Sequence, residues 1–367
     1  MPSASCRRKR ERCRARGREK ACSSVQLASR PGTGHRYTRR SDFALGAGCC
    51  RIRASGFKSY GWTFALVNDG TFSPDRTENP HQTLGLTIVP CGPVLGAEVV
   101  GLRIGNPVET DTATVLRALL LRYKVLFLRD LDLTYAQHLA LGRVWGELEG
   151  HPVINHVPGY PQILDIRGSE GRVENAADDR CFRRLDKWHA DVTFRATPSM
   201  GAVLRARELP PMGGDTLWVD TAAAYQGLAD ETKAKIKGRS ATHDLLFDFN
   251  DRVGRRHRAT MAAEFPPQHH SVVRMHPETG ACSLFVNASF TSRIDGLSDA
   301  QSAALLRELL DQFKVPEYQI RFRWTPNAVV IWDNRATQHY PVADYWPATR
   351  RMERVTIAGV GRDHVED

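Results

Sequence analysis

Apolar and polar residues alternate along the chain in blocks that predict strands and helices in turn, from residue 84 onward and without an internal repeat. Residues 87–90 and 96–100 predict an opening pair of strands separated by a Gly-Pro break. Residues 112–122 predict a helix with Asp111 as its cap. The apolar face of this helix consists of Val115, Leu116, Leu119 and Leu120.

A second helix is predicted from Thr134, where Gln137 completes a capping box, to about residue 148. Gly142 and Gly146 lie inside this pattern and weaken it, because glycine in a helix interior costs stability relative to alanine.

The clearest helix pattern covers residues 298–313, where Ser298 and Gln301 form another capping box before an apolar stripe. Further strands are predicted at residues 125–128, 202–206, 216–219, 318–324, 328–332 and 354–359. Short strands with helices packed outside them are compatible with a closed β architecture such as a jelly roll, although the pattern alone does not select it.

Charge is distributed unevenly along the 367 residues. The formal net charge is +10, but residues 1–60 hold 16 Lys and Arg against 3 Asp and Glu, which leaves 35 against 38 for the rest. Five of the eight cysteines lie in the same basic part, and the other three are scattered. Scattered cysteines make no disulfide framework, so we expect a reducing compartment and a cytoplasmic location.

Residues 1–82 form a basic extension that we separate from an enzyme domain of residues 83–363. Such charge density is typical of a disordered arm that could bind nucleic acid nonspecifically. A transit peptide and upstream sequence from a misassigned start are the other interpretations. We favour a disordered or misassigned extension, with no specific nucleic-acid partner. No apolar run approaches the ~20 residues that a membrane helix needs, so no membrane association is expected.

Two segments carry the candidate chemistry, WHADVTF at residues 188–194 and WDNRATQHY at residues 332–340. Side chains two apart on a strand point to the same face, so His189 and Asp191 could reach one metal ion, with His339 as the third ligand. Two imidazoles and one carboxylate leave three positions open, which suits Fe(II) oxygenases. Arg350 follows close enough to offer its guanidinium group to a carboxylate in the same cavity.

Taken with GGDTLW at residues 213–218, these segments resemble the taurine dioxygenase family of Fe(II)/2-oxoglutarate oxygenases. That family also includes alkylsulfatases and aryloxyalkanoate dioxygenases, and the resemblance runs from residue 84 to residue 361. It implies an α+β fold with a double-stranded β-helix core, jelly-roll and cupin-like, flanked by helices.

The resemblance also implies the chemistry. It predicts an enzyme that uses Fe(II), 2-oxoglutarate and O2 to hydroxylate the carbon next to a heteroatom of a small anionic substrate, releasing succinate and CO2. Alkyl sulfates, sulfonates and aryloxyalkanoates are the substrate classes that it leaves open. We expect a homo-oligomer, either a dimer or a tetramer.

Residue by residue, the resemblance assigns His189, Asp191 and His339 to the iron. It places Arg350 and Thr216 on the distal carboxylate of 2-oxoglutarate. Arg354 would contact either the substrate anion or the other end of the cosubstrate.

The substrate pocket would include His151, Ile154, Leu185 and Val192 in addition to Arg354. Ile154 and Leu185 stand where the taurine-specific pattern has a tyrosine and an asparagine. Both are polar contacts replaced by apolar side chains, which makes taurine a poor candidate and favours a larger, more apolar anion.

Two alternatives remain open from the residues. The same three ligands could serve a metal-dependent hydrolase, although such an enzyme gives no reason for Arg350 and Thr216. Taurine dioxygenase proper is the second alternative.

Other conspicuous residues have plainer interpretations. We expect His257, His269 and His270 to be exposed loop residues, in a segment of residues 244–270 that could also form a lid over substrate. Asn334 is expected to stabilise its loop, and Trp332 to pack beside the metal ligands.

Overall fold

In this computed structural model the described residues are 84–152, 154–168, 187–249 and 258–360. The predicted extension of residues 1–82 lies outside them, as do Leu185 and His257. Within the described part, no helix is long and apolar enough to cross a membrane.

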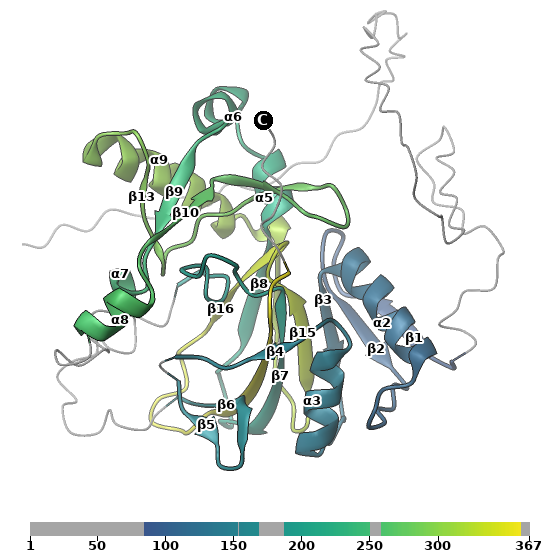
Figure 1. Ribbon diagram of the computed structural model, residues 1–367. Helices are drawn as coiled ribbons and strands as arrows, with labels where there is room; N and C mark the ends of the chain where they lie inside the picture. The colour runs from purple at the N-terminus through teal and green to yellow at the C-terminus, as the bar shows by residue number, and fades with distance from the viewer. Residues whose placement is uncertain (1–83, 153, 169–186, 250–257, 361–367) are drawn as a thin grey trace, which may run out of the picture. The chain divides into compact units, whose positions relative to one another are not determined.

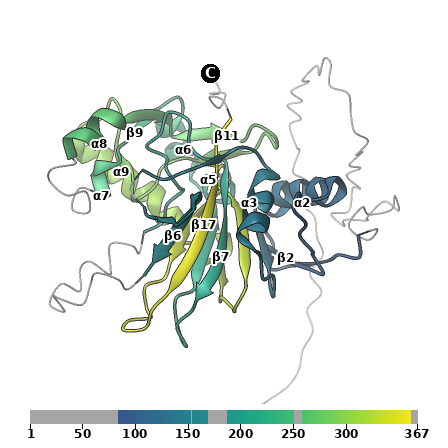
Figure 2. The same cartoon turned by 60° about the horizontal axis from the view of Figure 1, so that its bottom comes forward.

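A large mixed sheet forms one side of the core (Figure 1). Its strands follow the order β1-β2-β3-β15-β7-β17-β6-β5, with β4 paired to β17, and all neighbours are antiparallel except β2 and β3. Figure 2 shows β6, β17 and β7 side by side. The strands are β1 (Thr87–Pro90), β2 (Ala97–Val100), β3 (Val125–Leu128), β4 (Leu148–Glu149), β5 (His156–Val157), β6 (Tyr160–Arg167), β7 (Gly201–Glu208), β15 (Val329–Asp333) and β17 (Arg351–Ile357).

A smaller antiparallel sheet packs against the large one. It consists of β14 (Gln319–Phe322), β8 (Thr216–Asp220) and β16 (Thr337–Pro341), with β8 in the centre. Aromatic rings fill the space between the sheets, where Trp218 of the small sheet lies 5.7 Å from Phe127 and 5.9 Å from Trp332 of the large one. The two sheets therefore share one apolar interior, as the jelly-roll prediction requires.

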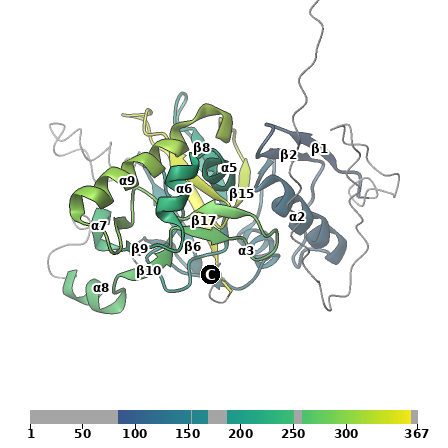
Figure 3. The ribbon, with the colours of Figure 1, turned by 90° about the horizontal axis from the view of Figure 1, so that it is seen from above.

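Helices cover the outer face of each sheet (Figure 3). Helices α2 (Thr110–Tyr123) and α3 (Tyr135–Arg143) pack on the large sheet. On the small sheet lie α5 (Thr221–Gln226), α6 (Asp230–Ile236) and α9 (Asp299–Asp311). The leucine stripe predicted for residues 298–313 is buried there, so it belongs to the core.

Shorter elements lie outside the two sheets. They are a three-stranded sheet of β9 (Ser240–His243), β10 (Gln268–Ser271) and β13 (Thr291–Ile294), a hairpin of β11 (Val273–Met275) and β12 (Cys282–Leu284), helices α7 (Leu246–Phe249) and α8 (Arg258–Glu264), and the 3-10 turns η1 (Gln312–Lys314) and η2 (Pro316–Tyr318).

The capping boxes predicted at Thr134 and Ser298 are both present. The prediction that the helix from Thr134 reaches residue 148 is wrong, because α3 ends at Arg143. A Cβ atom on Gly142 would lie 2.8 Å from Val355, so glycine allows this turn of helix to approach β17 closely. Gly146 then adopts a φ of 153°, which ends the helical path.

The predicted cap of the first helix is also wrong. Helix α2 begins one residue before Asp111, and its N-cap residue, Glu109, makes no side-chain capping bond. Asp111 instead lies in the first turn, where a carboxylate interacts favourably with the positive end of the helix dipole.

His138 of α3 is fully buried, and its Nε2 atom lies 3.0 Å from the carbonyl oxygen of Val203 on β7. Burial, reinforced by Arg205, lowers the pKa of His138 to about 3. Below about pH 6.5 the unfolded chain binds a proton at this histidine, whereas the folded chain does not until about pH 3. Folding stability therefore falls as the pH decreases between these values.

We expect His138→Gln to reduce the acid sensitivity of folding, because glutamine can keep the bond to Val203 but gains no proton. Between about pH 6 and about pH 4, the wild type loses up to about 1.4 kcal/mol of unfolding free energy per pH unit through this group. Urea unfolding across that range measures the slope. His156→Gln, which removes an exposed histidine of β5, is the control, and an equally steep slope in His138→Gln would contradict the prediction.

Candidate metal centre

The three predicted metal ligands meet where two distant segments form a short antiparallel bridge. The amide of His189 donates to the carbonyl of His339 on β16 at 3.1 Å, and the amide of His339 donates back at 2.9 Å. This reciprocal pair of backbone bonds fixes the two imidazoles side by side, with ring centroids 4.2 Å apart. Segments 150 residues apart in sequence therefore share one site.

Asp191 lies beside the two histidines, but its local structure differs from the one predicted. It lies in a turn, not on the face of a strand, so the strand-spacing argument for His189 and Asp191 is wrong. Val192 follows with a φ of 47°, in the left-handed region that β-branched residues rarely adopt. The turn closes through a 3.0 Å bond from the amide of Arg195 to the carbonyl of Val192.

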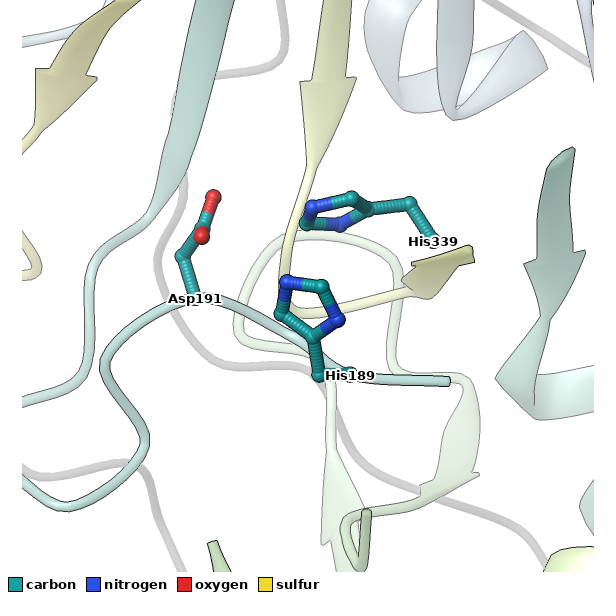
Figure 4. Close-up of side chains that lie close together, drawn as sticks. All are labelled: His189, Asp191 and His339. Atoms are coloured by element: carbon teal, nitrogen blue, oxygen red, sulfur yellow. The ribbon is translucent and has the colours of Figure 1, made fainter. Parts of the chain in front are cut away.

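The donor atoms of His189, Asp191 and His339 all lie within 4.8 Å of one another (Figure 4). The Nδ1 atom of His189 lies 2.9 Å from the carbonyl of Lys187, which fixes Nδ1 as the donor and leaves Nε2 as an acceptor for a metal. Among the described residues, Oδ2 of Asp191 and Nδ1 of His339 are buried without a hydrogen-bond partner. These two buried polar atoms and the nitrogen and oxygen donor set fit a divalent iron ion.

The carboxylate of Asp191 is ionised at neutral pH. Burial alone would raise its pKa, but Arg354 and the neighbouring histidines outweigh that effect and lower the pKa to about 2. Arg354 donates to Oδ1 of Asp191 at 2.5 Å, so one carboxylate oxygen is bound and the other is available. Burial also lowers the pKa of His339 well below its ordinary value, which keeps its imidazole neutral and able to bind a cation.

Polar contacts support the backbone around the ligands. Asn334, as predicted, stabilises its loop: its Oδ1 atom accepts from Trp332 at 2.9 Å and from the Asp191 amide at 3.5 Å, and its Nδ2 atom donates to Ser199 at 2.8 Å. The ring of Trp332 lies 4.9 Å from that of His339, which confirms that it packs beside the ligand.

A second buried network, not predicted from the sequence, holds the turn after Asp191. Asn287 donates to the hydroxyl of Thr193 at 2.9 Å, and Nδ1 of His243 lies 2.9 Å from the same oxygen. Both Asn287 and His243 are almost completely buried. No local sequence signal links residues 193, 243 and 287, because the fold alone brings them together.

Arg350 and Thr216, the two residues predicted to bind the distal carboxylate of 2-oxoglutarate, lie next to each other. Arg350 is buried and donates through Nη2 to Thr216 at 3.3 Å and through Nε to the carbonyl of Gly214 at 2.9 Å. Trp324, which the sequence analysis missed, donates to Thr216 at 3.0 Å. A Cβ atom on Gly214 would lie 3.0 Å from Arg350, which explains why this turn contains glycine. Burial lowers the pKa of Arg350 only to about 10, so the guanidinium remains charged at neutral pH.

Among the predicted substrate residues, His151 lies near Arg354 and Asp191, whose charges act on it. His151 is buried, accepts a 3.2 Å bond from the amide of Ile154, and faces the edge of Phe194 at 6.5 Å. Burial, with a contribution from Arg354, lowers the pKa of His151 to about 3, so the ring is neutral at physiological pH.

Val192 belongs to a small apolar cluster, which we call the apolar wall. Its members are Val192, Phe194, Leu245 and Phe290, with Met261 and Phe265 packed against them. The sequence analysis did not single out Phe194, which lies centrally with ring contacts to Phe265 at 5.6 Å and Phe290 at 5.1 Å.

His270 is not the exposed loop residue that was predicted. It lies half-buried on β10 with Nε2 3.0 Å from the carbonyl of Arg195, and burial lowers its pKa to about 4. His269 is exposed, as predicted, but also belongs to β10. The suggestion that residues 244–270 form a lid remains a prediction.

Comparison with known proteins agrees with this geometry. The family described as taurine catabolism dioxygenase TauD, TfdA matches residues 87–356. An alpha-ketoglutarate-dependent sulfate ester dioxygenase of Pseudomonas putida is 33% identical over 76% of this chain and 91% of its own length. An alkylsulfatase of Acinetobacter baylyi is 30% identical over 77% and 87%.

A solved structure is similar as well. The structure of AAD-2 in complex with Mn(II) and N-oxalylglycine superimposes with a TM-score of 0.64 at 28% identity, covering 76% of this chain and 99% of AAD-2. This similarity confirms the double-stranded β-helix predicted from the sequence.

We expect His339→Ala to weaken Fe(II) binding by more than about 100-fold, because the ion loses one of three protein ligands. Anaerobic titration with Fe(II) and 2-oxoglutarate, followed through the weak visible band of their chelate, measures the loss. His269→Ala removes an exposed histidine and serves as the control. Unchanged iron affinity in His339→Ala would exclude it from the ligand set.

We expect Arg350→Met to cost about 2–5 kcal/mol of 2-oxoglutarate binding free energy, since it removes a buried cation from its carboxylate. Thr216→Ala should cost less, because it removes one neutral hydroxyl. The KM for 2-oxoglutarate measures both. Arg351→Met, at the next position along the chain but paired with Asp165, is the control, and an unaltered KM in Arg350→Met would refute the assignment.

Proposed function

Because this chain belongs to the taurine catabolism dioxygenase family, TauD, TfdA, it is a dioxygenase that uses Fe(II), 2-oxoglutarate and O2, and we propose that it oxidises alkyl sulfate esters. The observation that carries the substrate class is the position of the apolar wall. It includes Val192 and Phe194 from the turn that contains Asp191, and Asp191 is bonded to the buried cation Arg354. A sulfate group and an alkyl chain would each find a suitable partner there.

Iron held at this site would, with 2-oxoglutarate and O2, supply the oxidising chemistry that an unactivated C–H bond requires. In this proposal, His189, Asp191 and His339 hold the iron, and Arg350 with Thr216 holds the distal carboxylate of 2-oxoglutarate. These residues position the reactants, and none of them has to transfer a proton.

Arg354 would hold the sulfate group through its guanidinium, with neutral His151 beside it. The apolar wall would take the alkyl chain and exclude water from the reacting carbon. This arrangement would direct the carbon next to the ester oxygen toward the iron.

Hydroxylation of that carbon places a hydroxyl group and a sulfate group on the same atom. The hydroxyl then loses its proton as the C–O bond to sulfate breaks, which yields an aldehyde and sulfate. The reaction consumes one 2-oxoglutarate and one O2 and releases succinate and CO2.

Ile154 argues against taurine as the substrate. Its side chain offers no hydrogen bond at a position where the taurine-specific pattern has a tyrosine, and its amide is already bonded to His151. A pocket that lacks such polar contacts loses little by accepting an apolar chain. Leu185, the second departure from that pattern, lies outside the described residues.

We also propose that the enzyme works as a homo-oligomer, a dimer or a tetramer, as the family resemblance implies. Light scattering of the purified chain would determine its molar mass.

The test of the proposed function is a substrate panel of hexyl sulfate, taurine and 2,4-dichlorophenoxyacetate, with succinate and sulfate measured together. We expect succinate formation to depend on hexyl sulfate, with one sulfate released per succinate, and at least about tenfold lower kcat/KM for taurine. Sulfate release without O2 or 2-oxoglutarate would indicate hydrolysis instead. A clear preference for taurine or the aryloxy acid would replace the proposed substrate class.

A further inference from the structure

Strand β17 and the short strand β4 line one side of the site with polar groups. Glu149 of β4 pairs with Thr356 of β17, and Leu148 pairs with Ile357. Leu148 and Ile357 both belong to the apolar core beneath α2 and α3. Since successive side chains on a strand alternate, Glu149, Thr356 and Arg354 share the opposite face, which looks into the site.

This face carries buried polar atoms without partners. Among the described residues, Oε1 of Glu149, Oγ1 of Thr356 and Nε of Arg354 have no hydrogen bond. Residues diagonal to each other across paired strands lie close enough for long side chains to meet, so the carboxylate of Glu149 is within reach of Arg354.

Arg195 contacts Glu149 from the other side. Its Nη1 atom forms an ion pair with Oε2 of Glu149, and its Nη2 atom donates to the carbonyl of Gly150 at 3.0 Å. Arg195 belongs to the turn that contains Asp191, through the bond from its amide to Val192. Its guanidinium also lies 6.0 Å from the ring centroid of Phe265 in the apolar wall.

Four charged side chains thus alternate in sign in the order Arg195, Glu149, Arg354 and Asp191. Burial raises the pKa of Glu149, while Arg195 and then Arg354 act in the opposite direction, as two cations on either side of one carboxylate would. Without Arg195, Arg354 would be the cation among the described residues that still acts on this half-buried carboxylate.

We propose that Arg195 is a positioning residue that binds Glu149 and thereby keeps Arg354 available for the anionic group of the substrate. A carboxylate tethered beside the guanidinium would otherwise compete with the incoming sulfate. Arg195 itself does not contact substrate in this arrangement. The inference rests on the proposed function, because it assumes that Arg354 binds the substrate anion.

The test compares Arg195→Met, Glu149→Gln and the double variant. Methionine removes the charge of Arg195 but keeps a long apolar side chain against Phe265. We expect Arg195→Met to raise both the KM for hexyl sulfate and its anaerobic Kd about tenfold, with kcat and the KM for 2-oxoglutarate within about twofold of the wild type. Calorimetric titration of the anaerobic Fe(II) and 2-oxoglutarate complex gives the Kd without turnover.

The decisive result is rescue. Neutralising Glu149 in the double variant removes the competitor, so the double variant should bind hexyl sulfate within about twofold of the wild type. Glu149→Gln alone should bind it at least as tightly as the wild type. Arg351→Met, which removes an arginine ion pair of similar exposure from the opposite face of β17, controls for loss of stability.

Three outcomes would overturn the inference while leaving the proposed function intact. Unchanged hexyl sulfate binding in Arg195→Met would show that Arg195 does not influence Arg354. Weaker hexyl sulfate binding in Arg195→Met that is not restored in the double variant would show that Arg195 acts without Glu149. If Arg195→Met does not fold, weaker binding in Glu149→Gln would exclude competition by Glu149. Wild-type enzyme that turns over another substrate and does not bind hexyl sulfate would instead overturn the proposed function, and this inference with it.

Discussion

The site depends on the two reciprocal backbone bonds between His189 and His339. They join His189, just before the turn that contains Asp191, to β16, and among the described residues no other strand pairing connects these two segments. With the bridge in place, the turn after His189 has to bring Asp191 back toward both imidazoles. Asn334, Thr193 and their partners hold that turn, including the unfavourable backbone conformation of Val192.

The two faces of strand β17 make different kinds of contact. On one face, Arg354 donates to Asp191 of the candidate metal centre, and Arg350 precedes the strand beside Thr216. On the other face, Glu353 is completely buried and binds Arg205 at 2.6 Å. This outer pair fixes the position of the strand against β7, so the inward-facing arginine is placed by a contact on the side away from the site.

Much of this organisation could be predicted from local patterns. Apolar runs identified the buried strands, and the capping boxes at Thr134 and Ser298 identified two helix starts. The ligand set came from a resemblance between whole segments, and the geometry around it did not follow from spacing: His189 and Asp191 are adjacent through a turn, not along a strand. Neither the contact of His243 with Thr193 nor that of Trp324 with Thr216 could be predicted, because each joins residues far apart in the chain.

The order of strands in the large sheet has a consequence for synthesis of the chain. Strand β15 lies between β3 and β7, and β17 lies between β7 and β6. The strands β3, β6 and β7 are synthesised first, and they pair with strands that come from residues 329–357. A nascent chain that has not yet reached β15 exposes the unpaired edges of β3, which is wholly apolar, and of β7, whose first six residues are buried in the finished fold. Such a fold is dominated by contacts distant in sequence and completes late, and until then its open strand edges need protection from other chains.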